Sequence, residues 1–160
     1  MTKAVWGSVL TAAAVLLFSN PVYAQATDTA NVTVSATVSA KAKLTVGGTA
    51  SFSDADPDVT TLLTATSAVS LDVKARTTTN GNVTLTVLAS DDLSNGTDVI
   101  GIGNLTWTVT GTGFAAGTMS KTAAQSIGAW TGGGTQSGTQ TYKPVNSWSY
   151  KTGSYSTTVT

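Results

Sequence analysis

The sequence contains no histidine, no cysteine and no glutamate. Without histidine or cysteine it has no residues for a Ser-His-Asp triad, a thiol nucleophile, a disulfide or a metal site with imidazole or thiolate ligands. A hydrolase that works with two carboxylates would have to use aspartate alone. These absences exclude the commonest catalytic centres, and we expect a non-enzymatic protein that binds no cofactor.

Charged side chains are scarce, at 10% of the 160 residues, and eight basic residues balance eight aspartates. Proteins that bind nucleic acid neutralise its phosphates with a basic stripe, so we expect no nucleic-acid partner. Four basic residues fall on neighbouring predicted strands: Lys41, Lys43, Lys74 and Arg76. Lysine on an edge strand blocks unwanted strand pairing, and we favour this role over a site for an anionic polymer.

The N-terminus has the pattern of a secretory signal peptide. A basic start precedes the apolar run Val5–Phe18, whose 14 residues are too few to span a bilayer. Small residues permit cleavage after Ala24 or two residues later. We expect residues 1–24 to be removed and residues 25–160 to form one domain. It would lie in the periplasm, on the cell surface or outside the cell, without membrane insertion.

Threonine dominates the sequence, at 32 of 160 residues, and valine alternates with it in several segments. Branched side chains pack well on a pleated surface, and a period of two marks strands with one buried face. We therefore predict an all-β, immunoglobulin-like antiparallel β-sandwich of about eight to ten short strands. The clearest alternating segments are 32–38, 69–75, 83–87 and 105–109.

Turn residues separate these segments. Asn80-Gly81 lies between two predicted strands, 69–76 and 82–89, and predicts a hairpin. The glycine-rich stretch 131–139 is interpreted as a long loop, because too little chain follows it for a second core. Residues 139–142 and 155–160 are predicted as closing strands. The second of these still alternates where the sequence ends, so we expect the last strand to be cut short.

Aspartates supply the only candidates for a metal site or for catalysis. Asp54, Asp56 and Asp58 have the alternate spacing of a weak Ca²⁺ candidate, but no glutamate closes the loop, and a solvated acidic turn is favoured. Asp91 and Asp92 are adjacent, so on a strand they would point to opposite faces and rarely act on one bond. We therefore assign no metal and no catalytic residue.

Aromatic side chains are the candidates for ligand binding. Trp107 shares a face with Leu105 and Val109, which predicts a place in the core. Three others flank the glycine-rich stretch: Trp130, Trp148 and Tyr150. Exposed aromatic faces suit the apolar sides of sugars, so these three could bind a glycan, or they could plug the end of the sandwich.

Two family resemblances follow from these segments. A signal peptide, then ANVTVSATV at 30–38, then GSYSTTVT at 153–160, resembles bacterial spore-coat-protein-U-type domains, which are similar to subunits of chaperone–usher pili. The usual cysteines of that family are missing. LTWTV at 105–109 resembles half of a WxL-type surface domain, with valine where leucine would stand. Both resemblances imply an exported, non-catalytic surface protein.

We expect a structural protein of the cell surface, such as a fimbria-like subunit that associates with itself or with other surface subunits. In strand addition an extended segment uses alternate side chains as plugs, and the candidates here are Val32, Val34, Ala36 and Val38. The alternative is a WxL-type module that binds cell-wall or extracellular glycan through Trp130, Trp148 and Tyr150.

Overall fold

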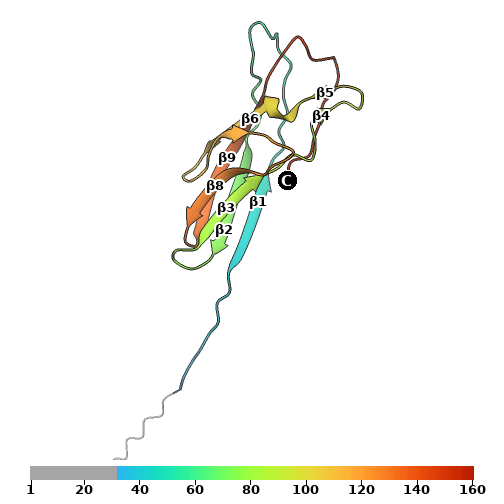
Figure 1. Ribbon diagram of the computed structural model, residues 1–160. Helices are drawn as coiled ribbons and strands as arrows, with labels where there is room; N and C mark the ends of the chain where they lie inside the picture. Colours follow the sequence, from blue (N-terminus) through green and yellow to red (C-terminus); the bar gives the residue numbers. More distant parts are fainter. Residues whose placement is uncertain (1–31) are drawn as a thin grey trace, which may run out of the picture. The chain divides into compact units, whose positions relative to one another are not determined.

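The alternating valine and threonine segments form strands that stack in two layers (Figure 1). The computed structural model describes residues 32–160. The chain divides into two units, Met1–Ala36 and Thr37–Thr160, and the fold below is that of the second. The predicted signal peptide and its cleavage sites lie outside the described residues.

Five strands form the larger sheet, in the order β1-β2-β9-β6-β7, and every neighbouring pair is antiparallel. β9 pairs with both β2 and β6 and is the longest strand, with 11 residues. The centre of this sheet is therefore held on both sides by backbone hydrogen bonds. The strands are β1 (Lys41–Gly47), β2 (Val69–Arg76), β6 (Leu105–Thr110), β7 (Gly117–Thr118) and β9 (Gly134–Pro144).

The second layer is a two-stranded sheet of β3 (Asn82–Val87) and β8 (Gln125–Thr131), which lies across the larger sheet (Figure 1). The segment before β7 also bonds to β8: Ala115 N–H donates to Ile127 O at 3.0 Å, and Ala129 N–H donates to Gly113 O at 3.0 Å. The two sheets are thus joined on the β6–β7 side. The remaining elements are β4 (Leu93–Ser94), β5 (Val99–Ile100) and the 3₁₀ helix η1 (Ile102–Asn104).

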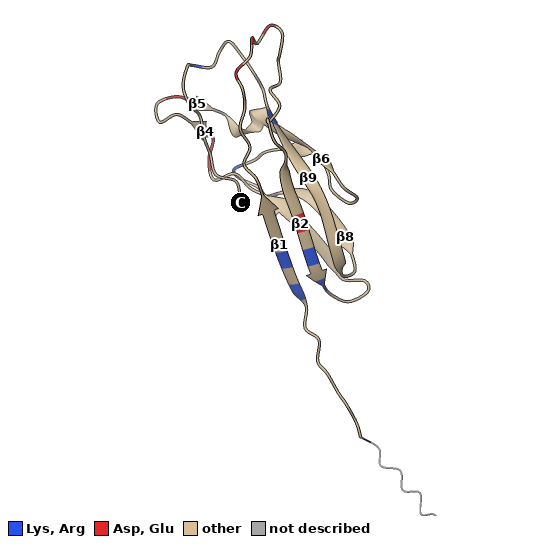
Figure 2. Ribbon diagram, turned by 180° about the vertical axis from the view of Figure 1, so that it is seen from behind, with Lys and Arg blue, Asp and Glu red and all other residues tan. Residues whose placement is uncertain are grey.

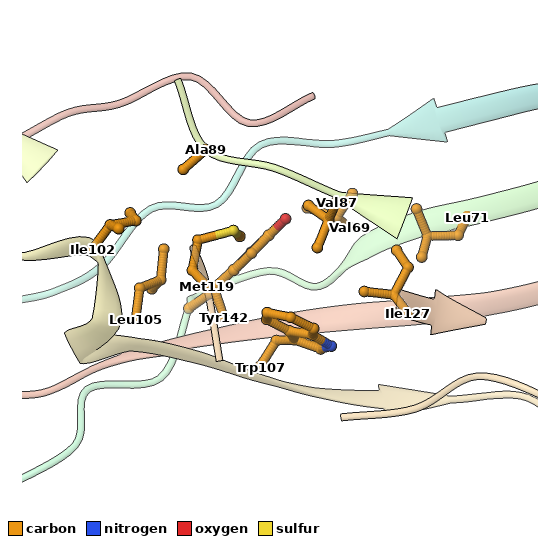
Figure 3. Packing of buried hydrophobic residues seen from close by; sticks show 11 residues of the cluster. Val69, Leu71, Val87, Ala89, Ile102, Leu105, Trp107, Met119, Ile127 and Tyr142 are labelled. Carbon is orange, nitrogen blue, oxygen red and sulfur yellow. The ribbon is translucent and has the colours of Figure 1, made fainter. Parts of the chain in front are cut away.

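The core lies between these two layers and centres on Trp107 (Figure 3). Its side chain is 2% exposed, and its indole N–H donates to Ala115 O at 2.9 Å. Leu71 of β2, Val87 of β3 and Ile127 of β8 are also buried, so both sheets contribute. This confirms the core position predicted for Trp107 from its face of the strand.

The all-β prediction is confirmed: nine strands occur among residues 32–160, and the only helix there is η1. The antiparallel sheets fit a β-sandwich, while the immunoglobulin-like connectivity stays a prediction. Within the same residues, no helix is long and apolar enough to cross a membrane.

The predicted hairpin at Asn80-Gly81 is wrong. A tight turn does form there, with Gly81 N–H donating to Thr78 O at 3.0 Å. However, β2 pairs with β1 and β9, whereas β3 pairs with β8. The turn therefore passes the chain from one sheet to the other, because β3 has to cover the apolar face of the larger sheet.

The loop predicted at 131–139 is also wrong. Only Gly132 and Gly133 connect β8 to β9, and β9 begins at Gly134. Glycine is needed within β9 for packing: a Cβ on Gly138 would meet the Thr110 carbonyl oxygen and the Phe114 ring. Gly138 thus permits the close approach of a neighbouring strand and a ring, and it does not mark a flexible segment.

The two closing strands have different outcomes. Residues 139–142 lie within β9, as predicted. The segment 155–160 is not a continuous strand: Ser156 and Val159 form single bridges, to Ser94 and Ala89. The C-terminal segment therefore pairs through two separate bridges and not through a continuous ladder.

Candidate functional site

Among the strands of residues 32–160, none lies beside one edge of β3. In an antiparallel strand, successive N–H and C=O groups point to opposite sides. Ala89 N–H donates toward Ser120 on the β8 side, whereas Leu88 exchanges hydrogen bonds of 2.9 and 2.8 Å with Thr160 on the other side. By the same alternation Thr84 and Thr86 point their N–H groups to the Thr160 side. No backbone partner for them occurs within residues 32–160.

The larger sheet is uncovered on the corresponding side. Leu44 and Val46 of β1 pair with Val73 and Leu71 of β2, so all four face the same way. The two β2 residues are 5% and 3% exposed, but Leu44 and Val46 are 48% and 55% exposed. The sheets join at β6–β7, so the free edge of β3 and the bare apolar face of β1 lie on the opposite side. Together they form what we call the open side of the sandwich.

The predicted strand at 32–38 is absent, which corrects the sequence analysis: residues 32–40 have no strand pairing. The apolar side chains of this segment, Val32, Val34 and Val38, are 83%, 88% and 68% exposed, and Ala36 is exposed too. A strand needs a partner ladder and a face to bury, and this segment has neither within the described residues. Its alternating valines are left without burial.

A cavity of about 1020 Å³ lies between the loops that carry Phe52 and Tyr150 and is also lined by Leu93 of β4. The buried residues Leu105 and Tyr142 form part of its wall, so it reaches the core. Asn146 ties two of its loops together, because its amide donates to Ala55 O at 2.9 Å and to Thr60 O at 3.0 Å.

The structure brings two of the three predicted glycan residues together. Trp148 and Tyr150 both line this cavity, and Trp148 is 70% exposed, with its indole N–H donating to Asp58 Oδ1 at 3.0 Å. Trp130 does not join them. It packs edge-on against Phe114, with ring centroids 5.0 Å apart, and its N–H donates to Thr112 O. Tyr155, another aromatic residue that the sequence offers for a glycan-stacking surface, also lines the cavity.

The acidic turn of the Ca²⁺ candidates holds its own backbone. Asp56 Oδ1 accepts the Asp58 N–H at 2.9 Å, and its carbonyl accepts the N–H groups of Val59 and Thr60. Asp58 also accepts from Trp148. No group of three acidic side chains placed to hold a metal ion occurs among residues 32–160, so Asp54 gains no shared site with the other two.

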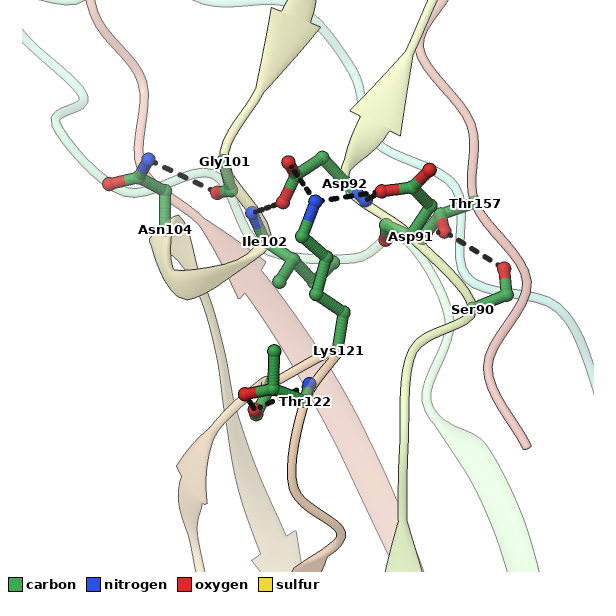
Figure 4. A network of polar contacts seen from close by, with 10 residues as sticks. Ser90, Asp91, Asp92, Gly101, Ile102, Asn104, Lys121, Thr122 and Thr157 are labelled. Atoms are coloured by element: carbon green, nitrogen blue, oxygen red, sulfur yellow. Dashed lines mark hydrogen bonds and ion pairs between the residues drawn. The ribbon is translucent and has the colours of Figure 1, made fainter.

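The carboxylates of Asp91 and Asp92 lie on the same side of the chain, and not on opposite faces as expected. Lys121 Nζ is 2.8 Å from Asp91 Oδ1 and 2.6 Å from Asp92 Oδ2, so one ammonium bridges both carboxylates (Figure 4). The expectation of opposite faces fails because the chain bends here instead of continuing β3. Asp92 Oδ1 also accepts the Ile102 N–H at 2.8 Å, which fixes the start of η1.

The ion pairs set the protonation of this network. Hydrogen bonding to Lys121 is the main cause that lowers the pKa of Asp91 and of Asp92, and the backbone N–H groups of Asp92 and Ile102 add to it. The same bonds raise the pKa of Lys121. All three side chains stay charged at neutral pH, which suits a structural clamp and leaves no group ready to transfer a proton.

No protein-family model, curated protein or solved structure matches the chain.

Proposed function

We propose that the protein is an exported, non-catalytic structural subunit of the cell surface that assembles by strand addition. The observation that carries this proposal is the open side of the sandwich. An added strand would bond to the free edge of β3 and place alternate side chains against Leu44 and Val46. An open edge of this kind is what most β-proteins avoid unless a partner covers it.

The segment 32–38 suits the role of added strand. Its apolar side chains recur at every second position, so in extended form they share one face. They are exposed in the described structure and gain nothing there. Insertion of this segment beside β3 of a second copy would bury apolar surface on both partners. Each Å² of apolar surface removed from water contributes about 25 cal/mol of favourable free energy.

Thr84→Pro tests the edge. Proline lacks the N–H that an added strand needs, and at this position the monomer uses no such bond, so the isolated fold should persist. We expect the parent chain to form multimers in size-exclusion chromatography with light scattering. Thr84→Pro and Val34→Asp should each shift the population to monomer, while the control Thr84→Val should assemble like the parent.

Two results would contradict the proposal. One is a parent chain that is strictly monomeric and heat-stable with residues 30–38 protected from hydrogen exchange, since the segment would then be paired within its own chain. The other is full assembly of Thr84→Pro, which would mean that copies associate by another surface.

Glycan binding is the second candidate function, and the cavity beside Trp148 and Tyr150 favours it. Aromatic rings at the rim of a concave site stack on sugars, and nearby amides and carboxylates accept or donate to hydroxyl groups. Trp148→Ala should abolish retention on peptidoglycan or polysaccharide. The neighbouring exposed residue Val59 gives the control variant Val59→Ala, which should be retained like the parent. No retention of the parent chain on any glycan tested would remove this candidate.

A further inference from the structure

Four of the eight basic residues of the chain stand together on the outer face of β1 and β2 (Figure 2). Lys43 pairs directly with Lys74, and Lys41 pairs directly with Arg76. Directly paired residues lie on the same face of a sheet, and so do residues two apart. The inward positions between them are apolar, and all four basic side chains are exposed. We call these four residues the basic face.

Protection of a sheet edge explains only half of this face. β1 is an edge strand, so Lys41 and Lys43 can block unwanted pairing there. Lys74 and Arg76 belong to β2, which has β1 on one side and β9 on the other. They guard no edge. Their positions instead put like charges directly opposite each other, an arrangement that destabilises a sheet.

No acidic side chain forms an ion pair with the basic face within the described residues. The ion pairs among residues 32–160 are those of Lys121 with Asp91 and Asp92, which lie outside the basic face. Asp72 lies on the same face of β2, but it accepts a hydrogen bond of 2.6 Å from Ser137 and forms no ion pair. The other aspartates in the described part lie in loops away from the basic face (Figure 2). Four basic side chains against one aspartate leave the face with a net positive charge that is available to a partner.

We propose that the basic face binds a linear polyanion whose charged units are phosphates. Lysine binds phosphate as a point charge and arginine as a fork. Arg76 is already oriented, because its Nε donates to Ser39 O at 2.9 Å. None of the four basic residues lines the cavity beside Trp148, and all four project from a sheet, so the face suits charge density along a chain rather than the shape of a small molecule. This proposal does not depend on strand addition.

Binding of inorganic polyphosphate, measured by fluorescence anisotropy at low salt, tests the proposal. The double variant Lys43→Gln/Lys74→Gln should bind about tenfold more weakly and show a shallower dependence on salt, because fewer counterions are released. The matched control is Lys143→Gln/Lys151→Gln, which removes the same charge elsewhere and should bind like the parent. Thermal melting should show that removing the opposed lysines does not lower stability.

Three outcomes would overturn the proposal. The parent chain could fail to bind polyphosphate at low salt. Both double variants could lose affinity equally, which would show a response to net charge alone. The parent could bind vesicles that contain phosphatidylglycerol but not polyphosphate, which would assign the basic face to a lipid surface instead of a polymer.

Discussion

At the scale of single residues, Gln140 is the buried group with an unmet requirement. It is 2% exposed, and apart from the aromatic residues Trp107 and Tyr142 no other side chain with a polar group is buried in the described part. Its Oε1 accepts the Tyr142 hydroxyl at 3.1 Å, but its Nε2 has no partner. The same dry surroundings raise the pKa of Tyr142 through desolvation. An amide N–H left unpaired in such a place costs about 1–3 kcal/mol.

The double variant Gln140→Met/Tyr142→Phe should therefore be more stable than the parent. Both side chains keep their approximate shape and lose only polar atoms, so we expect the free energy of unfolding to rise by about 1–3 kcal/mol. Gln140→Met alone should gain less, because the Tyr142 hydroxyl then lacks its acceptor. Urea unfolding measures both. A double variant no more stable than the parent would mean that Gln140 Nε2 is hydrogen-bonded in solution.

At the scale of elements, alternation predicted strands well but not their partners. β2 was predicted at its observed bounds and β6 at nearly its bounds, because burying one face imposes a period of two. Partner choice depends on contacts distant in sequence, so the local signal of Asn80-Gly81 could not reveal that β3 changes sheet. The segment 32–38 alternates as clearly as β2 does, yet it lacks a ladder.

The candidate sites were predictable to a smaller extent. Exposed aromatic residues near the loops pointed to Trp148 and Tyr150, because their polar, turn-rich surroundings leave large rings near the surface. The sequence could not show that Trp130 lies apart from these two, since Phe114 packs against it from a strand-to-strand connection that no local pattern ties to it. The open side is formed by two strands far apart in sequence, so it required the fold.

The clamp between Lys121 and the turn at Asp91 and Asp92 is an element-scale device with a defined pH response. Because both carboxyl pKa values are lowered on folding, their contribution to stability is present above the ordinary value of 3.8 and is lost as pH falls through the lowered values. The pKa of Lys121 is raised, so its contribution is present below 10.5 and is lost as pH rises through the raised value.

Lys121→Met should move both carboxyl pKa values toward 3.8. Each aspartate should keep part of its lowering, because Asp92 N–H still donates to Asp91 and Ile102 N–H still donates to Asp92. An NMR titration of the side-chain carboxyl carbons measures this directly. Lys151→Met is the control, because it removes a lysine without touching either aspartate. Unchanged values in Lys121→Met would mean that the ion pairs do not persist in solution.

At the scale of the whole molecule, residues 37–160 form a sandwich that is closed on one side and, among the described residues, open on the other. The connection between β6 and β8 joins the sheets through backbone bonds, so amides there should exchange slowly with solvent. On the opposite side the residues after β3 bond to the C-terminal segment: Leu88 N–H donates to Thr160 O, and Ser90 N–H donates to Thr158 O. The ladder that these bonds begin points along the free edge of β3, where Thr84 and Thr86 lack acceptors within the described residues.

Hydrogen exchange in a monomeric sample should therefore alternate along one strand. Val83 and Leu85 point their N–H groups toward β8 and should exchange slowly, whereas Thr84 and Thr86 should exchange quickly. Assembly through the open side should slow Thr84 and Thr86 and leave Val83 unchanged. Association by another surface would preserve the alternation, and a monomer in which Thr84 is as protected as Val83 would mean that the edge is already occupied by its own chain.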